Sequence, residues 1–217
     1  MKRSMIVGVV LALAVASFAA PATAKKKKAK PVATTLFLHG NAPVGDGVEV
    51  ASNVVDGTVM TMDTTEPTQP VPSSMSYSAP VGNPECTGNP FFPSWEGKLT
   101  GKVVGDVKLI AHLGSAPGTA IARLWTDVPF ASCTSETAGV DAFVEPVAEV
   151  EVEVPAGHSE LEIVFEDINV KVAANMIVEL HQTSLANQGR IFYDSPDFAS
   201  HLEFGCVPAS GKTCATS

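Results

Sequence analysis

The stretch 147–182 reads VAEVEVEVPAGHSELEIVFEDINVKVAANMIVELHQ, and apolar residues alternate with glutamates from 147 to 154 and from 160 to 166. Because successive side chains of a strand leave opposite faces, this period of two predicts strands with one buried and one solvated face. The PAGH segment at 155–158 predicts a hairpin turn between the two runs. The register that keeps both apolar sets on one face puts Val154 opposite Leu161. That register places Glu153 opposite Glu162 and Glu149 opposite Glu166.

Short runs with strand character continue on both sides of this stretch. We expect strands at 34–39, 58–63, 98–104, 106–113, 119–127, 168–172, 175–182, 189–194 and 200–204. The runs 106–113 and 119–127 are expected to form a second hairpin across 114–118. Because no stretch of about twelve residues combines helical periodicity with caps, the sequence predicts an all-β chain. Many short strands separated by Gly and Pro predict one antiparallel β-sandwich of jelly-roll type over 34–217.

The N-terminus has the pattern of a secretory signal peptide. Lys2 and Arg3 precede an apolar run at 5–20, and Ala22-Thr23-Ala24 supplies small residues for cleavage. We therefore expect a signal peptide at 1–24 and a disordered basic leader at 25–33. An uncleaved membrane anchor is the alternative, but the apolar run is short for a span. The expected location is extracellular or at the cell surface, with no integral membrane span after cleavage.

Charge is distributed unevenly along the chain. The formal net charge is -9, yet seven of the fourteen Lys and Arg residues lie before Pro31, so the body is far more acidic than the leader. Phosphate recognition needs a basic face, so nucleic acid is not an expected partner. The lysine-rich leader is either a solvated segment or a weak electrostatic tether to an anionic surface.

The chain has four cysteines, at positions 86, 133, 206 and 214. An even number in an exported protein predicts disulfides, with three possible pairings. Cys206 and Cys214 are close in sequence, with Pro208 and Gly211 between them, so a local bridge is favoured. That choice leaves Cys86 to pair with Cys133.

Two acidic regions are candidate structural Ca²⁺ sites, since a hard cation takes carboxylate oxygens. The first is a glycine-rich loop with Asp46, Glu49 and Asp56, where ordinary turn chemistry is the alternative. Its spacing matches no EF-hand. The second is the row of glutamates in 147–166, where a solvated edge that blocks strand addition is the alternative. No other cofactor is expected.

An aromatic and basic set is the candidate ligand site. In 106–127, one face of the expected hairpin is apolar, and the other face carries His112, Arg123 and Trp125. An exposed Trp beside Arg and His would stack on a sugar ring and hydrogen-bond its hydroxyls. Trp95, in the segment GNPFFPSWEG, is a second platform or, with Phe91 and Phe92, a lid. The alternative is that another strand or the proline-rich loop covers this face.

The segments GDVKLIAHLGSAPGTAIARLWTDV (105–128) and VKVAANMIVELHQ (170–182) resemble the strand rhythm of galactose-binding-like jelly-roll domains. The similarity covers 97–204. It is greatest to the C-terminal β-sandwich of secreted X-prolyl-peptidase and cocaine-esterase-type hydrolases. In that family the β-sandwich is an accessory module, and catalysis belongs to a separate α/β-hydrolase domain. This chain lacks the G-x-S-x-G nucleophile motif, so no catalytic residue is carried over.

The sequence therefore predicts a secreted, non-catalytic binding or accessory protein whose partner is a carbohydrate or a cell-envelope polymer. A structural or adhesive protein that binds another protein is the first alternative. A hydrolase with an unrecognised site is the second, although none of the five histidines lies in a catalytic or metal motif.

Overall fold

The computed structural model describes residues 29–40, 60–76, 94–115, 117–127, 145–182, 189–211 and 213–215. Within these ranges the chain forms eleven strands and no helix, so the all-β prediction is confirmed. The strands are β1 (Val32–His39), β2 (Met60–Asp63), β3 (Ser73–Ser76), β4 (Ser94–Lys98), β5 (Gly101–Ser115), β6 (Gly118–Thr126), β7 (Ala148–Val154), β8 (Gly157–Val172), β9 (Asn175–Gln182), β10 (Arg190–Tyr193) and β11 (His201–Pro208). No helix in the described ranges is long and apolar enough to cross a membrane.

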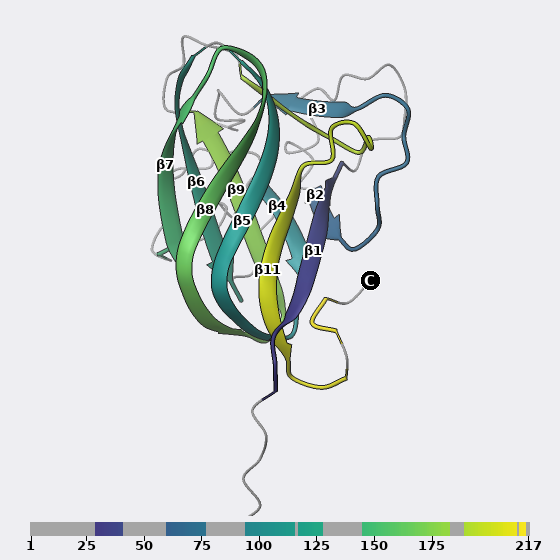
Figure 1. The fold of residues 1–217 in the computed structure, drawn as a ribbon, viewed down its shortest axis with the longest axis vertical. Coiled ribbons are helices and arrows are strands. Elements are labelled where there is room, and N and C mark those ends of the chain that lie inside the picture. The colour runs from purple at the N-terminus through teal and green to yellow at the C-terminus, as the bar shows by residue number, and fades with distance from the viewer. Residues whose placement is uncertain are drawn as a thin grey trace, which may run out of the picture.

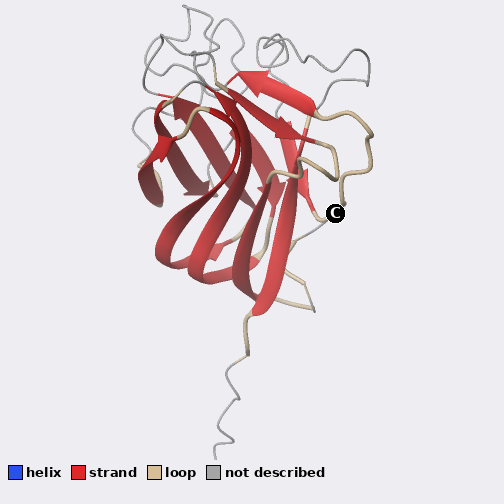
Figure 2. Ribbon diagram, turned by 45° about the horizontal axis from the view of Figure 1, so that its top comes forward, coloured by secondary structure: helices blue, strands red, loops and turns tan. Residues whose placement is uncertain are grey.

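The strands form one sheet that curls into a half-barrel. The front arm in Figure 1 contains β8, β5, β11 and β1, and the rear arm contains β4, β9, β6 and β7. Strand β2 joins the arms, because it pairs with β1 on one side and with β4 on the other. Strands β10 and β3 extend the sheet beside the upper end of β5, and Figure 2 shows the curl from above.

The predicted sandwich architecture needs correction. The β2–β4 pair is parallel, with Met60 beside Trp95, so the sheet is mixed and not purely antiparallel. The two arms belong to one continuous sheet, and a jelly-roll sandwich is therefore not confirmed. The short β2 strand produces this result, because it connects what would otherwise be two separate layers.

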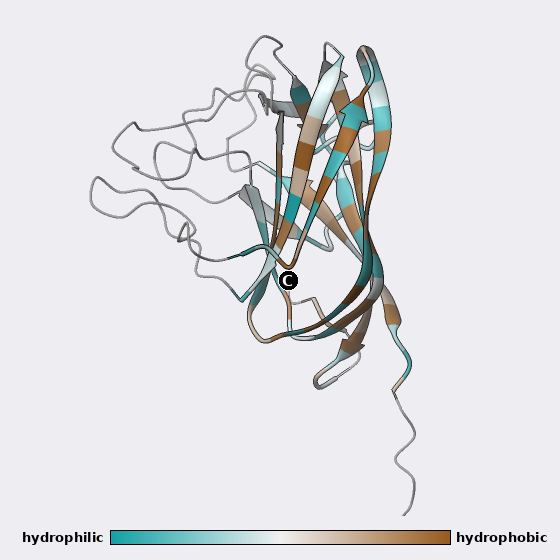
Figure 3. Ribbon diagram, turned by 90° about the vertical axis from the view of Figure 1, so that its left-hand side faces the viewer, coloured by the Kyte–Doolittle hydropathy of each residue, from teal (hydrophilic) through white to brown (hydrophobic). Residues whose placement is uncertain are grey.

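The core lies between the arms, and the alternation in the sequence correctly predicted which residues enter it. Val107, Leu109, Ala111 and Leu113 of β5 are all at most 1% exposed, and the inward side chains of β6 are as deeply buried. Figure 3 shows the same alternation of polar and apolar residues along the strands. Burial of a Leu or Val side chain contributes about 1.5–3 kcal/mol, so these rows hold the two arms together.

Both predicted hairpins are wrong. Strand β7 pairs with β6, where Val154 faces Gly118, and β8 pairs with β5, where Leu161 faces Ala111. Alternation determines which side of a strand is apolar, but it does not determine the neighbouring strand. A connection that leads from one arm to the other also keeps the apolar sides of both strands facing the core, just as a hairpin would.

The corrected register also removes the predicted facing of like charges. Glu149 lies opposite Arg123, and Glu162 lies opposite Ile110. Glu153 lies opposite Thr119. The true pairing is therefore electrostatically better than the predicted hairpin, in which glutamates faced each other.

The predicted disulfide between Cys206 and Cys214 is present, and both cysteines are buried. It holds the C-terminal segment against the lower end of β5, where Thr100 N–H donates to the Cys214 carbonyl at 2.9 Å. A Cβ on Gly101 would lie 2.8 Å from Cys214 Sγ, so only glycine allows this close approach. Cys86 and Cys133 lie outside the described residues, as do Asp46, Glu49 and Asp56 of the predicted calcium loop.

Candidate functional site

The two tryptophans do not form an open platform. Trp95 is 1% exposed and packs in the core, with its ring centroid 5.8 Å from that of Tyr193. Trp125 is 5% exposed and lies beside Ile177 of β9, which is also buried. Stacking on a sugar requires an accessible ring face, which neither indole offers here, and their burial favours the covered alternative over the predicted ligand site.

Arg123 is committed to its neighbours on the outer face of the rear arm. Its Nε donates to Glu149 on β7 at 2.6 Å, and its Nη1 donates to Glu179 on β9 at 3.1 Å. Burial lowers the pKa of Arg123, but these hydrogen bonds and charges outweigh burial, and the pKa lies above its usual value. The guanidinium therefore ties three strands together.

His112 is separated from Arg123 and Trp125, because β5 and β6 belong to opposite arms. On the outer face of the front arm, its ring meets Phe198 edge-on with centroids 5.9 Å apart. Its Nε2 lies 3.7 Å from Glu160 Oε2. Burial lowers the pKa of His112. The charge of Glu160 partly offsets this lowering, and the nearby His201 adds to it.

The turn at 194–200, between β10 and β11, organises this end of the front arm. The Ser200 hydroxyl donates to the Phe192 carbonyl at 2.6 Å and accepts from the His112 N–H at 2.9 Å. Phe198 packs on Phe192, with ring centroids 5.6 Å apart, and Phe192 in turn lies 5.4 Å from His158. Sequence reasoning missed this cluster, because its members come from three strands and a turn.

A shallow cavity of about 190 Å³ opens beside these rings, and we call it the aromatic hollow. Its lining consists of His112, Leu113, His158, Ser159, Glu160 and Phe198. Phe198 is half-buried, whereas the Glu160 side chain is 65% exposed at the rim. Apolar ring faces and a carboxylate acceptor therefore border the same space.

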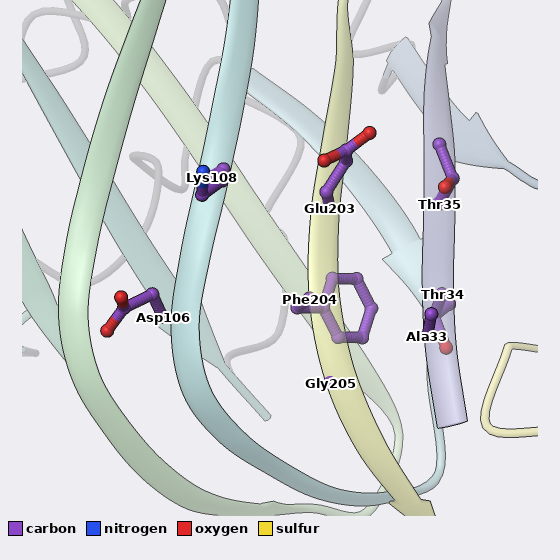
Figure 4. A pocket seen from close by; sticks show the side chains of 8 residues that line it. All are labelled: Ala33, Thr34, Thr35, Asp106, Lys108, Glu203, Phe204 and Gly205. Atoms are coloured by element: carbon purple, nitrogen blue, oxygen red, sulfur yellow. The ribbon is translucent and has the colours of Figure 1, made fainter. Parts of the chain in front are cut away.

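A second cavity of about 400 Å³ lies further down the same face, and we call it the Gly205 hollow (Figure 4). It exists because Ala33 and Gly205 lie opposite each other on β1 and β11 and leave its floor without bulky side chains. Lys108 and Glu203, also cross-strand neighbours, form a polar wall. Asp106, at the bulge between Gly105 and Val107, borders the hollow, and its Oδ1 accepts a hydrogen bond from the Asp167 N–H at 3.1 Å.

The positive charge of Lys108 is paired with a carboxylate on the same face. Its Nζ donates to Glu162 of β8 at 2.9 Å. This hydrogen bond and the charge of Glu162 raise the pKa of Lys108, with smaller contributions from Glu203 and Asp106.

His39 links three parts of the sheet, and we call it the His39 clamp. At the end of β1, its Nδ1 lies 2.8 Å from Asp194 Oδ1, at the start of the 194–200 turn. Its Nε2 lies 3.5 Å from Asp63 Oδ1 on β2, without hydrogen-bond geometry, so this second contact is mainly electrostatic. The second carboxylate oxygen of Asp194 accepts from the Gly40 N–H at 2.9 Å.

The clamp favours a protonated imidazole. The hydrogen bond to Asp194 raises the pKa of His39 more than burial lowers it, and Asp63 raises it further. Burial raises the pKa of Asp63, but hydrogen bonds from Thr65 and the charge of His39 lower it below its usual value. Both ring nitrogens face carboxylates, so the protonated histidine forms ion pairs that connect β1 with β2 and with the 194–200 turn. No spacing in the sequence indicated it, because its members lie at 39, 63 and 194.

Metal binding finds no support in the described ranges, where no three His, Cys, Asp or Glu residues are grouped to hold an ion. The glutamates of 147–166, a candidate Ca²⁺ face in the sequence, are divided between β7 and β8, which pair with β6 and β5 on different arms.

No family model and no curated protein matches the chain. Among solved structures, it is similar to an aminopeptidase from a marine sediment Thaumarchaeota archaeon, with TM-score 0.47, 9% identity, and 80% of this chain and 36% of that chain covered. It is similar to a CocE/NonD family hydrolase from Staphylococcus aureus, with TM-score 0.49, 11% identity, and 82% and 37% covered. For an alpha-amino acid ester hydrolase the values are 0.45, 10%, 82% and 36%. The chain thus spans little more than a third of these hydrolases.

Proposed function

We propose that the chain is an exported, non-catalytic accessory domain that binds a carbohydrate or cell-envelope polymer. The binding surface is the outer face of β5 and β8 together with the 194–200 turn. The supporting observation is the aromatic hollow, where half-buried rings and an exposed carboxylate border one cavity.

This combination suits a sugar ring, which presents apolar C–H faces and hydroxyl edges. Binding sites are commonly apolar cavities with a few polar groups that orient the ligand. Phe198 offers a ring face, and Glu160 accepts hydrogen bonds from hydroxyl groups. The two buried tryptophans then contribute to stability and not to recognition.

One observation supports a non-catalytic role. The sequence lacks the G-x-S-x-G motif of α/β-hydrolases.

Retention on insoluble chitin, cellulose and peptidoglycan tests the proposal. We expect the wild-type chain to be retained on at least one polymer and Phe198→Ala to lose most of this retention. Ile121→Ala, a matched truncation on the outer face of β6, should bind like wild type, because β6 lies on the other arm. Absence of retention on every polymer, or equal retention of both variants, would reject the proposed site and favour a protein-binding role.

A further inference from the structure

We infer that the ligand is an extended, uncharged polysaccharide chain that crosses both the aromatic hollow and the Gly205 hollow. The inference rests on the proposed function and adds to it the length and charge of the ligand. The inference requires that the two hollows share a face, that a sugar ring can bind to the surface between them, and that the charges at both hollows suit hydroxyl groups.

The two hollows share the outer face of β5. His112 lines the aromatic hollow and Lys108 lines the Gly205 hollow, four residues earlier on the same strand. Since a strand rises about 3.3 Å per residue, the hollows are about 13 Å apart along β5. A single pyranose ring does not span this distance, whereas a chain of several rings does.

The surface between the hollows is partly apolar. Ile110 of β5 lies midway, with His201 of β11 on one side and Glu162 of β8 on the other. His201 is held in place, because its Nδ1 lies 2.6 Å from the Ala199 carbonyl oxygen. A sugar ring over Ile110 would therefore meet an aliphatic surface with polar groups at both edges.

The charges of this face favour hydroxyl groups over acidic groups. Asp106 and Glu203 line the Gly205 hollow, and Glu160 lines the aromatic hollow. Lys108, the cation of the Gly205 hollow, is already bonded to Glu162. Carboxylates accept hydrogen bonds from hydroxyls but repel carboxylates, so a polymer of uronic acids does not fit.

The test compares the affinities of short and long N-acetylchitooligosaccharides and cello-oligosaccharides by calorimetry. For wild type we expect the long oligomers of one series to bind at least about tenfold more tightly than the short ones. Ala33→Leu places a larger side chain on the exposed floor of the Gly205 hollow. It should remove this length advantage and leave the affinity for short oligomers unchanged. Ala173→Leu, at an exposed turn between β8 and β9, is the matched control.

A second variant guards against a folding defect in Ala33→Leu. Glu203→Gln keeps the size of an exposed side chain at the hollow and removes its charge, and it should also weaken the binding of long oligomers alone. Melting curves of all variants establish that they are folded.

The outcomes separate the two proposals. If short and long oligomers bind equally and neither variant changes their affinity, the inference is overturned while the proposed function stands. If no oligomer binds and no insoluble polymer retains the chain, the proposed function itself fails. Tighter binding of polygalacturonate, or of deacetylated chitosan, than of uncharged oligomers would also overturn the inference, because charge would then determine recognition.

Discussion

Replacing His39 with glutamine tests whether a protonated imidazole ties β1 to β2 and to the 194–200 turn. The His39 and Asp194 side chains are 17% and 8% exposed. A hydrogen bond to a charged group contributes about 1.5–3 kcal/mol. The Asp63 side chain is 37% exposed, so its attraction to His39 adds at most about 1 kcal/mol. We expect His39→Gln to lower the free energy of unfolding by about 2–3 kcal/mol, or the Tm by roughly 5–10 °C.

The pH dependence of this loss follows from the two pKa shifts. The pKa of His39 is raised above 6.5, so its contribution is complete below pH 6.5 and disappears as pH rises through the raised value. The pKa of Asp63 is lowered below 3.8, so its contribution is present above pH 3.8 and disappears as pH falls through the lowered value. The clamp is therefore strongest between these two limits. His112 has the opposite shift to His39, so only the difference between wild type and variant isolates the clamp.

Urea denaturation of wild type and His39→Gln at about pH 5.5 and about pH 8.5, on either side of the ordinary histidine pKa, measures this difference. The stability gap should reach its full value at the lower pH and shrink at the higher pH, because the pKa of His39 is raised in the folded state. His158→Gln, which removes an exposed imidazole, should give a small gap at both values. An equal gap at both pH values for His39→Gln would refute the assignment of a charged tie.

Three further changes are predicted from the structure. Gly101→Ala should lower the free energy of unfolding by about 1–3 kcal/mol in thermal melts, because its Cβ would press on the Cys206–Cys214 disulfide. Gly105→Ala is the control, because Gly105 also has a positive φ but has open space around it; this variant should cost about 1 kcal/mol from backbone strain alone. Arg123→Met should lower the free energy of unfolding by about 1–3 kcal/mol in urea titrations, because Glu179 loses a partner. Arg123→Lys should restore only part of this stability, and full recovery would show that the paired geometry of the guanidinium is unimportant. Trp125→Phe should lower the Tm without changing polysaccharide retention, and a loss of retention in the folded variant would restore the indole to the binding site.

The sequence was informative where a property depends on one strand alone. Alternation in 147–154 and 160–166 placed the right side chains on the buried side, and the short separation of Cys206 and Cys214 predicted their bridge. Pairing depends on distant segments, and there the prediction failed. The turn after Val154 suggested a hairpin, but the partners of β7 and β8 are β6 and β5.

The candidate site was harder to predict for the same reason. His112 was identified, but it was grouped with Trp125 because they lie on neighbouring runs of the sequence. The structure places His112 of β5 against Phe198, which lies much later in the sequence, in the turn between β10 and β11. Burial of Trp125 was equally hidden, since an outward position on one strand says nothing about what covers it.

The pairing of β1 with β11 has a consequence for how the chain acquires its shape during synthesis. Val32 pairs with Cys206, so β1 has both of its partner strands, β2 and β11, only after β11 has been synthesised. Strand β11 also separates β1 from β5, so a nascent chain that lacks it has no continuous front arm. Contacts this distant in sequence form slowly. Completion of the front arm therefore follows the emergence of β11 from the ribosome.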